Sequence, residues 1–155
     1  MIDDNDPRWA QHSGGEGHDG IEWAEGDEQL ARHLHDSVGP NGRFILDLLI
    51  DNPGERLSAD YIATQLNGGV TPSSAASGRH RVAASLITVG EQLAAQRRLP
   101  FYWWRGSNGD ASLYAMKPSV AELFRNVRHN AAADISSVKQ LSHRALAMRQ
   151  SRRDP

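Results

Sequence analysis

The stretch from Pro100 to Pro118, PFYWWRGSNGDASLYAMKP, constrains the fold of this chain most strongly, because it has the pattern of a β-hairpin. Residues 101–104 are all aromatic, and such residues suit a pleated, half-buried strand. The pair Asn108-Gly109 favours a turn with positive φ, and residues 113–116 return as a second strand. A two-stranded hairpin is marginal alone in water, so these aromatic side chains need helices to pack against.

Hydrophobic spacing predicts those helices. They are expected over residues 27–37, 44–51, 59–66, 79–97 and 119–128. In the second, the apolar stripe is Phe44, Ile45, Leu48 and Leu49; in the fourth it is Val82, Leu86, Val89 and Leu93. Ser58 is a suitable N-cap for the third helix, and Ser77 or Gly78 for the fourth.

The charges of the chain are unevenly distributed. Residues 1–36 contain ten Asp and Glu against two Arg, whereas the remainder contains fifteen Lys and Arg against nine acids. Such asymmetry suggests contact of the basic part with nucleic acid or a membrane surface. The alternative is solvated charge that happens to be unevenly spread.

Both ends of the chain are expected to lie outside the core. Residues 1–26 are rich in Gly and acids, so we predict a disordered acidic arm. Its apolar residues Trp9, Ile21 and Trp23 either dock on the folded body or bind a partner. Residues 129–155 are predicted as a basic helix or tail, which is also a candidate surface for a homodimer.

Length and composition favour one soluble domain. A chain of 155 residues supports one core, and without cysteine it has neither disulfides nor a thiolate metal site. No apolar run approaches the roughly 20 residues of a membrane-spanning helix, and the acidic N-terminus is unlike a signal peptide. We therefore expect a cytoplasmic protein without a membrane partner.

The order of elements in residues 38–128 resembles a winged helix-turn-helix domain, which is mainly α with a small β-hairpin. The resemblance rests on LSADYIATQL (residues 57–66), RHRVAASLITVGEQLAAQ from residue 79, and FYWWRGSNGDASLYAM (residues 101–116). The chain is also similar to an uncharacterised bacterial family known only as a domain of unknown function, through LIDNPGERLSAD, PFYWW and YAMKPSVAELF.

The winged-helix resemblance implies double-stranded DNA as the partner and transcriptional regulation as the role. Residues 79–97 would be the recognition helix in the major groove, and residues 101–116 the wing. The DNA-contacting residues would be Arg79, His80, Arg81, Ser85, Thr88, Arg105 and Asn108. Arg79 and Arg81 would either read guanine or clasp phosphates, and the acidic arm would compete with DNA for the basic face.

Other interpretations of these residues remain open. Exposed arginines on a long helix commonly face only solvent, and the domain would then be a winged-helix protein-interaction module. Arg97 and Arg98 are interpreted as partners of the helix C-terminal dipole. Trp103 and Trp104 alternate along the strand, so one of them should enter the core.

The sequence offers little support for catalysis. On a helix, the rings of His33 and His35 point in different directions and cannot share a metal. His80 has no acidic cluster nearby for a catalytic triad, and no glycine-rich loop follows a strand. We expect no enzyme, no catalytic or metal-binding residue and no cofactor.

Overall fold

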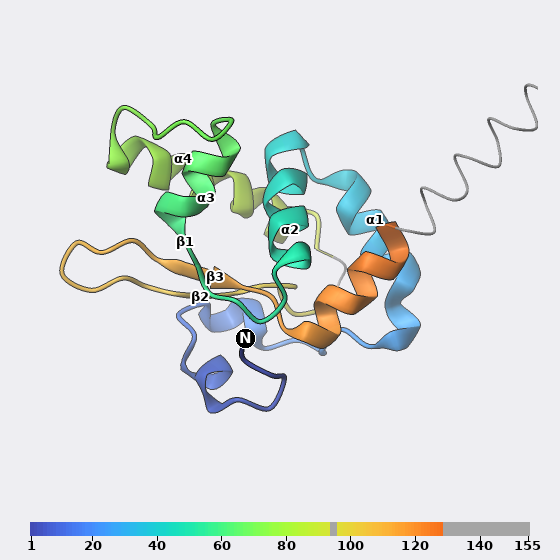
Figure 1. Cartoon of the computed structure of the whole chain (residues 1–155). Helices are drawn as coiled ribbons and strands as arrows, with labels where there is room; N and C mark the ends of the chain where they lie inside the picture. Colours follow the sequence, from blue (N-terminus) through green and yellow to red (C-terminus); the bar gives the residue numbers. More distant parts are fainter. Residues whose placement is uncertain (94–95, 129–155) are drawn as a thin grey trace, which may run out of the picture.

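The computed structural model describes residues 1–93 and 96–128, which form five α-helices and a small antiparallel sheet (Figure 1). The strands are β1 (Leu57–Ser58), β2 (Tyr102–Trp104) and β3 (Leu113–Ala115). β3 lies in the middle and pairs with both others, so the order across the sheet is β1-β3-β2. The predicted α+β class is therefore confirmed, and the hairpin gains a third strand.

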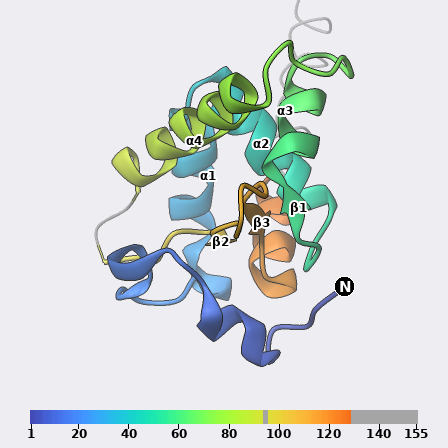
Figure 2. The same ribbon diagram turned by 90° about the vertical axis from the view of Figure 1, so that its left-hand side faces the viewer.

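Four α-helices precede the hairpin, and one follows it. They are α1 (Glu28–Ser37), α2 (Pro40–Asp51), α3 (Ala59–Leu66), α4 (Ala75–Glu91) and a helix over residues 118–128. Three short 3-10 turns come before them: η1 (Pro7–Gln11), η2 (Gly15–His18) and η3 (Glu25–Asp27). In both views α3 and α4 lie on one side of the sheet, with the N-terminal residues on the other, and in Figure 1 α1 and the helix over residues 118–128 stand beyond one end of the sheet (Figures 1 and 2).

α3 has the predicted bounds. The side-chain oxygen of Ser58 accepts a hydrogen bond from the backbone N–H of Tyr61 at 3.1 Å, as expected of an N-cap. Ile62 and Ala63 are buried, while the side chain of Tyr61 is 45% exposed. Local sequence is sufficient here because the cap and the apolar spacing agree.

α2 begins earlier than predicted, and its buried face is turned partly away from the predicted stripe. Ile45 and Leu49 of that stripe are buried as predicted, and Leu48 packs against the core. Pro40 occupies its first turn, where the missing backbone N–H of proline has no helical partner to lose. The buried side chains include Leu46 and Ile50, whereas Phe44 is 42% exposed. Gly42 explains the rotation, since a Cβ there would lie 3.0 Å from Thr88 Oγ1 of α4. The glycine lets α4 approach, and that contact selects the buried face.

α4 is displaced towards the N-terminus from its predicted position at residues 79–97. It starts at Ala75, because Ser74 accepts a hydrogen bond from the backbone N–H of Ser77 at 3.2 Å, and it ends at Glu91. Ser77 and Gly78, the predicted caps, lie inside the first turns. The serines before the helix offered several possible caps, and spacing alone did not choose among them.

The main core lies between the helices and one face of the sheet. The inward stripe predicted for α4 is confirmed, since Val82, Leu86 and Val89 are buried, and Leu93 packs against the same core. Tyr114 and Phe101 contribute from the sheet side, and their rings are 6.2 Å apart. The helix over residues 118–128 adds Phe124, which is 1% exposed.

Residues 1–24, here called the N-terminal strap, pack on the opposite face of the sheet instead of forming the predicted disordered arm (Figures 1 and 2). Ile2, Trp9 and Trp23 are 6%, 3% and 7% exposed. The ring of Trp9 meets that of Tyr102 edge to face, with centroids 5.2 Å apart, and lies tilted against that of Trp104 at 5.7 Å. Without Trp9, these rings would present aromatic surface to water. Average composition predicted disorder, but three well-placed apolar side chains supply enough burial.

The strap also closes the open edge of the sheet. The backbone N–H of Ser13 donates to the carbonyl of Trp103 at 2.7 Å, and Ser13 Oγ accepts from the N–H of Arg105 at 2.9 Å. Further along, the N–H of Ile21 donates to Gln96 O at 2.6 Å. An unpaired strand edge promotes association with other chains, so this cover protects β2.

The predicted basic helix or tail, with its candidate homodimer surface, falls on residues 129–155, outside the described residues. Within the described part, every helix is too short or too polar to cross a lipid bilayer.

Candidate interaction surface

Arg79, predicted to contact DNA, holds three elements of the protein together. Its guanidinium donates to both carboxylate oxygens of Asp60 in α3, at 2.9 and 3.0 Å, and to the carbonyl of Gly109 in the hairpin turn at 2.8 Å. The hydrogen bonds lower the pKa of Asp60 and raise that of Arg79. Because the charge and the hydrogen-bond donors of this guanidinium are already engaged within the protein, Arg79 has limited capacity to bind DNA.

Ser85 and Thr88 face α2 rather than solvent. Ser85 is 8% exposed, and its hydroxyl donates to Arg81 O at 2.7 Å. The hydroxyl of Thr88 donates to Ser85 O at 2.6 Å, beside Gly42. Both hydroxyls therefore satisfy carbonyls of their own helix.

His80 and Arg81 are exposed and line a shallow groove of about 600 Å³ between α4 and the start of α2. The start of α2 and its N-cap contribute Gly39, Pro40, Asn41 and Gly42 to the lining of this groove. The guanidinium of Arg81 makes no hydrogen bond or ion pair with the described residues. Ser85 and Thr88 line the same groove, so four of the five predicted contacts on α4 lie together there, although only His80 and Arg81 are exposed.

Arg105 and Asn108 lie on the hairpin loop, and both are exposed. Asn108 and Gly109 have φ values of 55° and 82°, so the predicted turn with positive φ is confirmed. The guanidinium of Arg105 lies 6.0 Å from the centroid of the Trp103 ring. The predicted DNA contacts are thus divided among the internal contacts of Arg79, the groove beside α2, which includes His80, Arg81, Ser85 and Thr88, and the hairpin loop.

The prediction that Arg97 and Arg98 neutralise a helix C-terminus is wrong, because α4 ends at Glu91. Arg97 donates to both oxygens of the Asp27 carboxylate at 2.9 and 3.1 Å, and this hydrogen bonding lowers the pKa of Asp27. Arg98 donates to Gly20 O at 2.7 Å. These arginines attach the strap and the start of α1 to the segment before β2.

A second groove, with a more apolar lining, lies between α4 and the sheet, and we call it the α4–sheet groove. Its volume is about 460 Å³, and its lining is formed by Ala83, Leu86, Ile87, Gly90, Leu99, Phe101, Trp103, Ser112 and Tyr114. Ile87 stands at its rim with 61% of its surface exposed, although the neighbouring Leu86 is buried. Gly90, three residues further along α4, also lines the groove and adds no side chain to its rim.

Sequence reasoning did not find this groove. The signal was available in α4, because Ile87 lies off the stripe formed by Val82, Leu86 and Val89, on a face where an apolar residue gains nothing from the core. The other wall comes from residues 99–103, which are far away in sequence. Only the packing of α4 across the sheet brings the two walls together (Figure 2).

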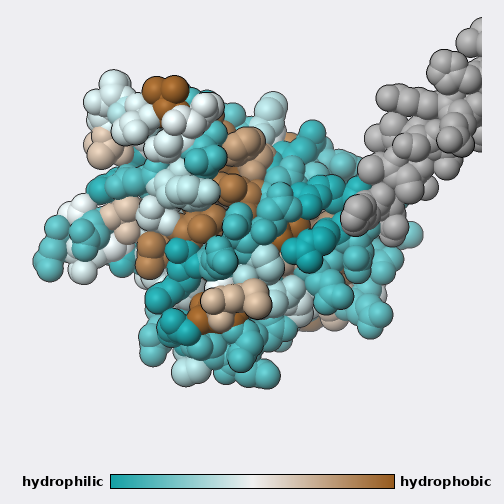
Figure 3. Space-filling model, in the orientation of Figure 1, coloured by the Kyte–Doolittle hydropathy of each residue, from teal (hydrophilic) through white to brown (hydrophobic). Residues whose placement is uncertain are grey.

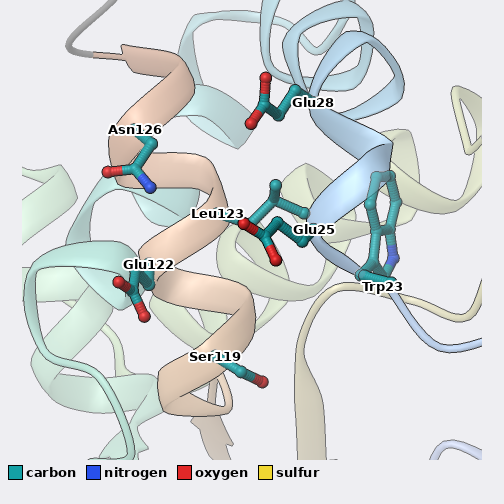
Figure 4. Close-up of a pocket in the computed structure, with 8 residues that line it drawn as sticks. Trp23, Glu25, Glu28, Ser119, Glu122, Leu123 and Asn126 are labelled. Carbon is teal, nitrogen blue, oxygen red and sulfur yellow. The ribbon is translucent and has the colours of Figure 1, made fainter.

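The described residues carry an excess of negative charge. Residues 1–93 and 96–128 contain twelve Lys and Arg against seventeen Asp and Glu. A hollow of about 320 Å³ between the segment 23–28 and the last helix is lined by Glu25, Glu28 and Glu122 (Figure 4). Carboxylates there repel a polyanion.

The surface in Figure 3 is hydrophilic over most of its area, with a band of apolar residues between α2 and α3. Phe44 on α2, at 42% exposed, and Val70 in the loop after α3, at 65%, are among the exposed apolar side chains. Neither lines the α4–sheet groove, and Val70 serves below as a reference position.

Comparison with known proteins identifies a family whose function is unknown. A family model described as "Family of unknown function (DUF6416)" matches residues 28–131. No curated protein and no solved structure matches the chain. The matched region begins at the start of α1, so the strap that covers the sheet precedes it.

Proposed function

This chain belongs to the DUF6416 family of unknown function, and because the family carries no role, we propose a function from the chain's own surface. The domain is a winged-helix protein-interaction module. Its α4–sheet groove binds the apolar face of a helix from a protein partner.

The order of elements supports the winged helix-turn-helix part of the proposal. α2, β1, α3 and α4 are followed by the strands β2 and β3, and β3 inserts between β1 and β2. In this arrangement α3 and α4 correspond to the two helices of a helix-turn-helix, and the loop between β2 and β3 corresponds to the wing. α3 and α4 pack closely through Gly78, where a Cβ would lie 3.0 Å from Ala63 Cβ.

The observation that carries the proposal is the exposed apolar surface of the α4–sheet groove. Ile87 and Trp103 stand on opposite walls, with Phe101 and Tyr114 below. Exposed contiguous apolar surface commonly marks a site for another protein, and grooves of this kind accept helices through side chains spaced three and four residues apart. Aromatic residues are also frequent among those that dominate binding energy.

The test is a substitution at the rim of the groove. We expect Ile87→Glu to weaken binding of an amphipathic helical ligand by about 30-fold or more, since a central apolar contact contributes about 2 kcal/mol. Val70→Glu is the matched control, because Val70 is equally exposed but lies outside the groove. Ligands selected from a library of amphipathic helices would be measured by isothermal titration calorimetry against the three proteins.

Both variants should unfold at the same denaturant concentration as the parent, because each change is on the surface. A ligand set that binds parent and Ile87→Glu equally, or that is lost with Val70→Glu, would contradict the assignment of the groove.

DNA binding is the second candidate, and the exposure of His80, Arg81 and Arg105 favours it. We expect double-stranded DNA to be retained only weakly at low salt, because the described residues carry more acids than bases. The measurement is fluorescence anisotropy with mixed-sequence DNA across a salt series. Tight binding that falls steeply with salt and is lost in the Arg81→Ala, Arg105→Ala double variant would support DNA over the groove.

A further inference from the structure

His18, in η2 of the strap, is buried without a hydrogen-bonding partner. It is 6% exposed, and its ring stacks on that of Tyr102 with centroids 4.0 Å apart and planes at 20°. Neither ring nitrogen meets a donor or acceptor among the described residues. A neutral imidazole tolerates this aromatic environment better than a charged one, because burial removes water from the cation.

The groups around this ring also disfavour a second positive charge. The ring of His12 lies 4.3 Å away, and Arg98 and Lys117 approach from the segments beneath the strap. Burial, followed by these charges, lowers the pKa of His18 to about 4. The backbone of Phe101 acts in the opposite direction and is the weakest of these influences. Burial likewise lowers the pKa of His12.

The acids near this site are already engaged or lie at its edge. Glu22 accepts from Lys117 Nζ at 2.8 Å and pairs with Arg98 at 3.4 Å. Asp4 accepts from the N–H of Ser119 at 3.1 Å. Asp19, next to His18, is exposed, and its negative charge acts to raise the pKa of His12. Burial nevertheless remains the largest influence on both rings.

The first part of the strap is separable from the main core. Ile2 and Trp9 belong to a small cluster with Tyr102, Trp104 and Ala115, whereas Trp23 belongs to the main core. Trp23 also donates through Nε1 to Arg98 O at 2.7 Å. A segment that makes only a small set of contacts of its own can unfold locally while the rest of the protein stays folded. Residues 1–20 are therefore anchored to the main core only where Trp23 follows them, and before it they contact the body through the small cluster and through hydrogen bonds such as Ile2 N–H to Gly54 O and Trp104 Nε1–H to Arg8 O.

We propose that residues 1–20 are a detachable cover that leaves the sheet when His18 and His12 gain protons. Its release frees the apolar face of β2, at Tyr102 and Trp104, and returns the carbonyl of Trp103 at the sheet edge to solvent. This inference does not depend on the proposed function.

The sign of the effect follows from the two protonation states. The docked cover favours neutral His18, so docking is strongest above the ordinary histidine pKa of 6.5 and weakens as the pH falls from there towards 4. The pKa of His18 is thus about 4 in the docked cover and 6.5 in the free one. At pH 5 this difference in pKa alone reduces the docking equilibrium constant by about 30-fold. Protonation of His12 acts in the same direction.

Hydrogen exchange measured by mass spectrometry tests the cover on the full chain. Protection factors for residues 1–20, corrected for the intrinsic effect of pH, are expected to fall about 30-fold between pH 7.5 and 5. Peptides from α2 and α3 should keep their protection. Unchanged protection of residues 1–20 at pH 5 would overturn the proposal.

Two variants assign the effect to one ring. His18→Phe keeps an aromatic ring on Tyr102 without a titrating group, so it should remove most of the loss of protection at low pH. His80→Phe makes the same change at an exposed histidine and should leave the loss intact. A loss in His18→Phe as large as in the parent would overturn the proposal.

A direct titration keeps the test decisive if His18→Phe does not fold. The His18 ring signal in the NMR spectrum of the parent should titrate well below the ordinary value of 6.5, whereas protection of residues 1–20 should begin to fall as soon as the pH drops below 6.5. A His18 pKa close to 6.5 would show that the docked cover does not oppose the charge.

Discussion

Replacing Trp23 with alanine is expected to lower the free energy of unfolding by about 3–5 kcal/mol, the cost typical of deleting a buried tryptophan. Its side chain is 7% exposed, and its ring centroid lies 5.3 Å from that of Phe124. The indole N–H also donates to the carbonyl of Arg98, which would lose its partner. Urea denaturation followed by far-ultraviolet circular dichroism measures the loss.

Ile21→Ala is the control for this prediction. Ile21 lies two residues earlier on the same segment, but it is 54% exposed. Its hydrogen bonds to Gln96 and Arg98 are made by the backbone. Its replacement should change stability by less than about 0.5 kcal/mol. Equal, small effects of the two substitutions would show that this part of the strap does not contribute to the core.

Arg97→Ala is expected to lower the midpoint of unfolding clearly below that of the parent, because it leaves the Asp27 carboxylate, which is largely shielded from solvent, without its cation. The Asp27 side chain is 10% exposed, and it also accepts a hydrogen bond from the N–H of Ala24 at 2.9 Å. Arg81→Ala removes the same side chain at an exposed position and should have little effect. Thermal and urea unfolding of both variants provide the comparison.

A second substitution separates the charge from the packing. Asp27→Asn keeps an oxygen for the Ala24 N–H but removes the charge, so in the Arg97→Ala background it should recover part of the loss. Failure to recover any stability would assign the cost to lost packing of the arginine instead.

The same ion pair has a defined pH dependence. Hydrogen bonding from Arg97 holds the pKa of Asp27 below its ordinary value of 3.8. The pair therefore stabilises the fold fully above that value and loses its contribution as the pH falls through the lower, folded-state pKa. This loss begins below the pH range in which the histidine cover responds, so the two effects separate in a titration.

Several elements could be predicted from local sequence. α3 has its predicted bounds because Ser58 and the spacing of Ile62 and Leu66 act within a few residues of one another. The Asn108-Gly109 turn depends on the backbone preference of two adjacent residues. The inward stripe of α4 follows from helical periodicity, although the ends of that helix do not.

The errors share one physical origin, which is contact between segments distant in sequence. Phe44 lies outside the core because Gly42 brings α4 against the neighbouring face of α2. The strap is ordered because Trp9 and Trp23 find aromatic partners about 90 to 100 residues further along the chain. Composition averages over a segment and does not report whether a complementary surface exists elsewhere.

The sequence by itself determined the class of fold, the aromatic hairpin, α3 and the stripe by which α4 enters the core, since each depends on residues within one or two turns. The tertiary structure decided what the exposed surface can bind. It engaged Arg79 with Asp60 and Gly109, turned Ser85 towards α2, and placed Ile87 across from Trp103. A side chain's chemistry is set by its type, but its availability depends on the partners that folding brings to it.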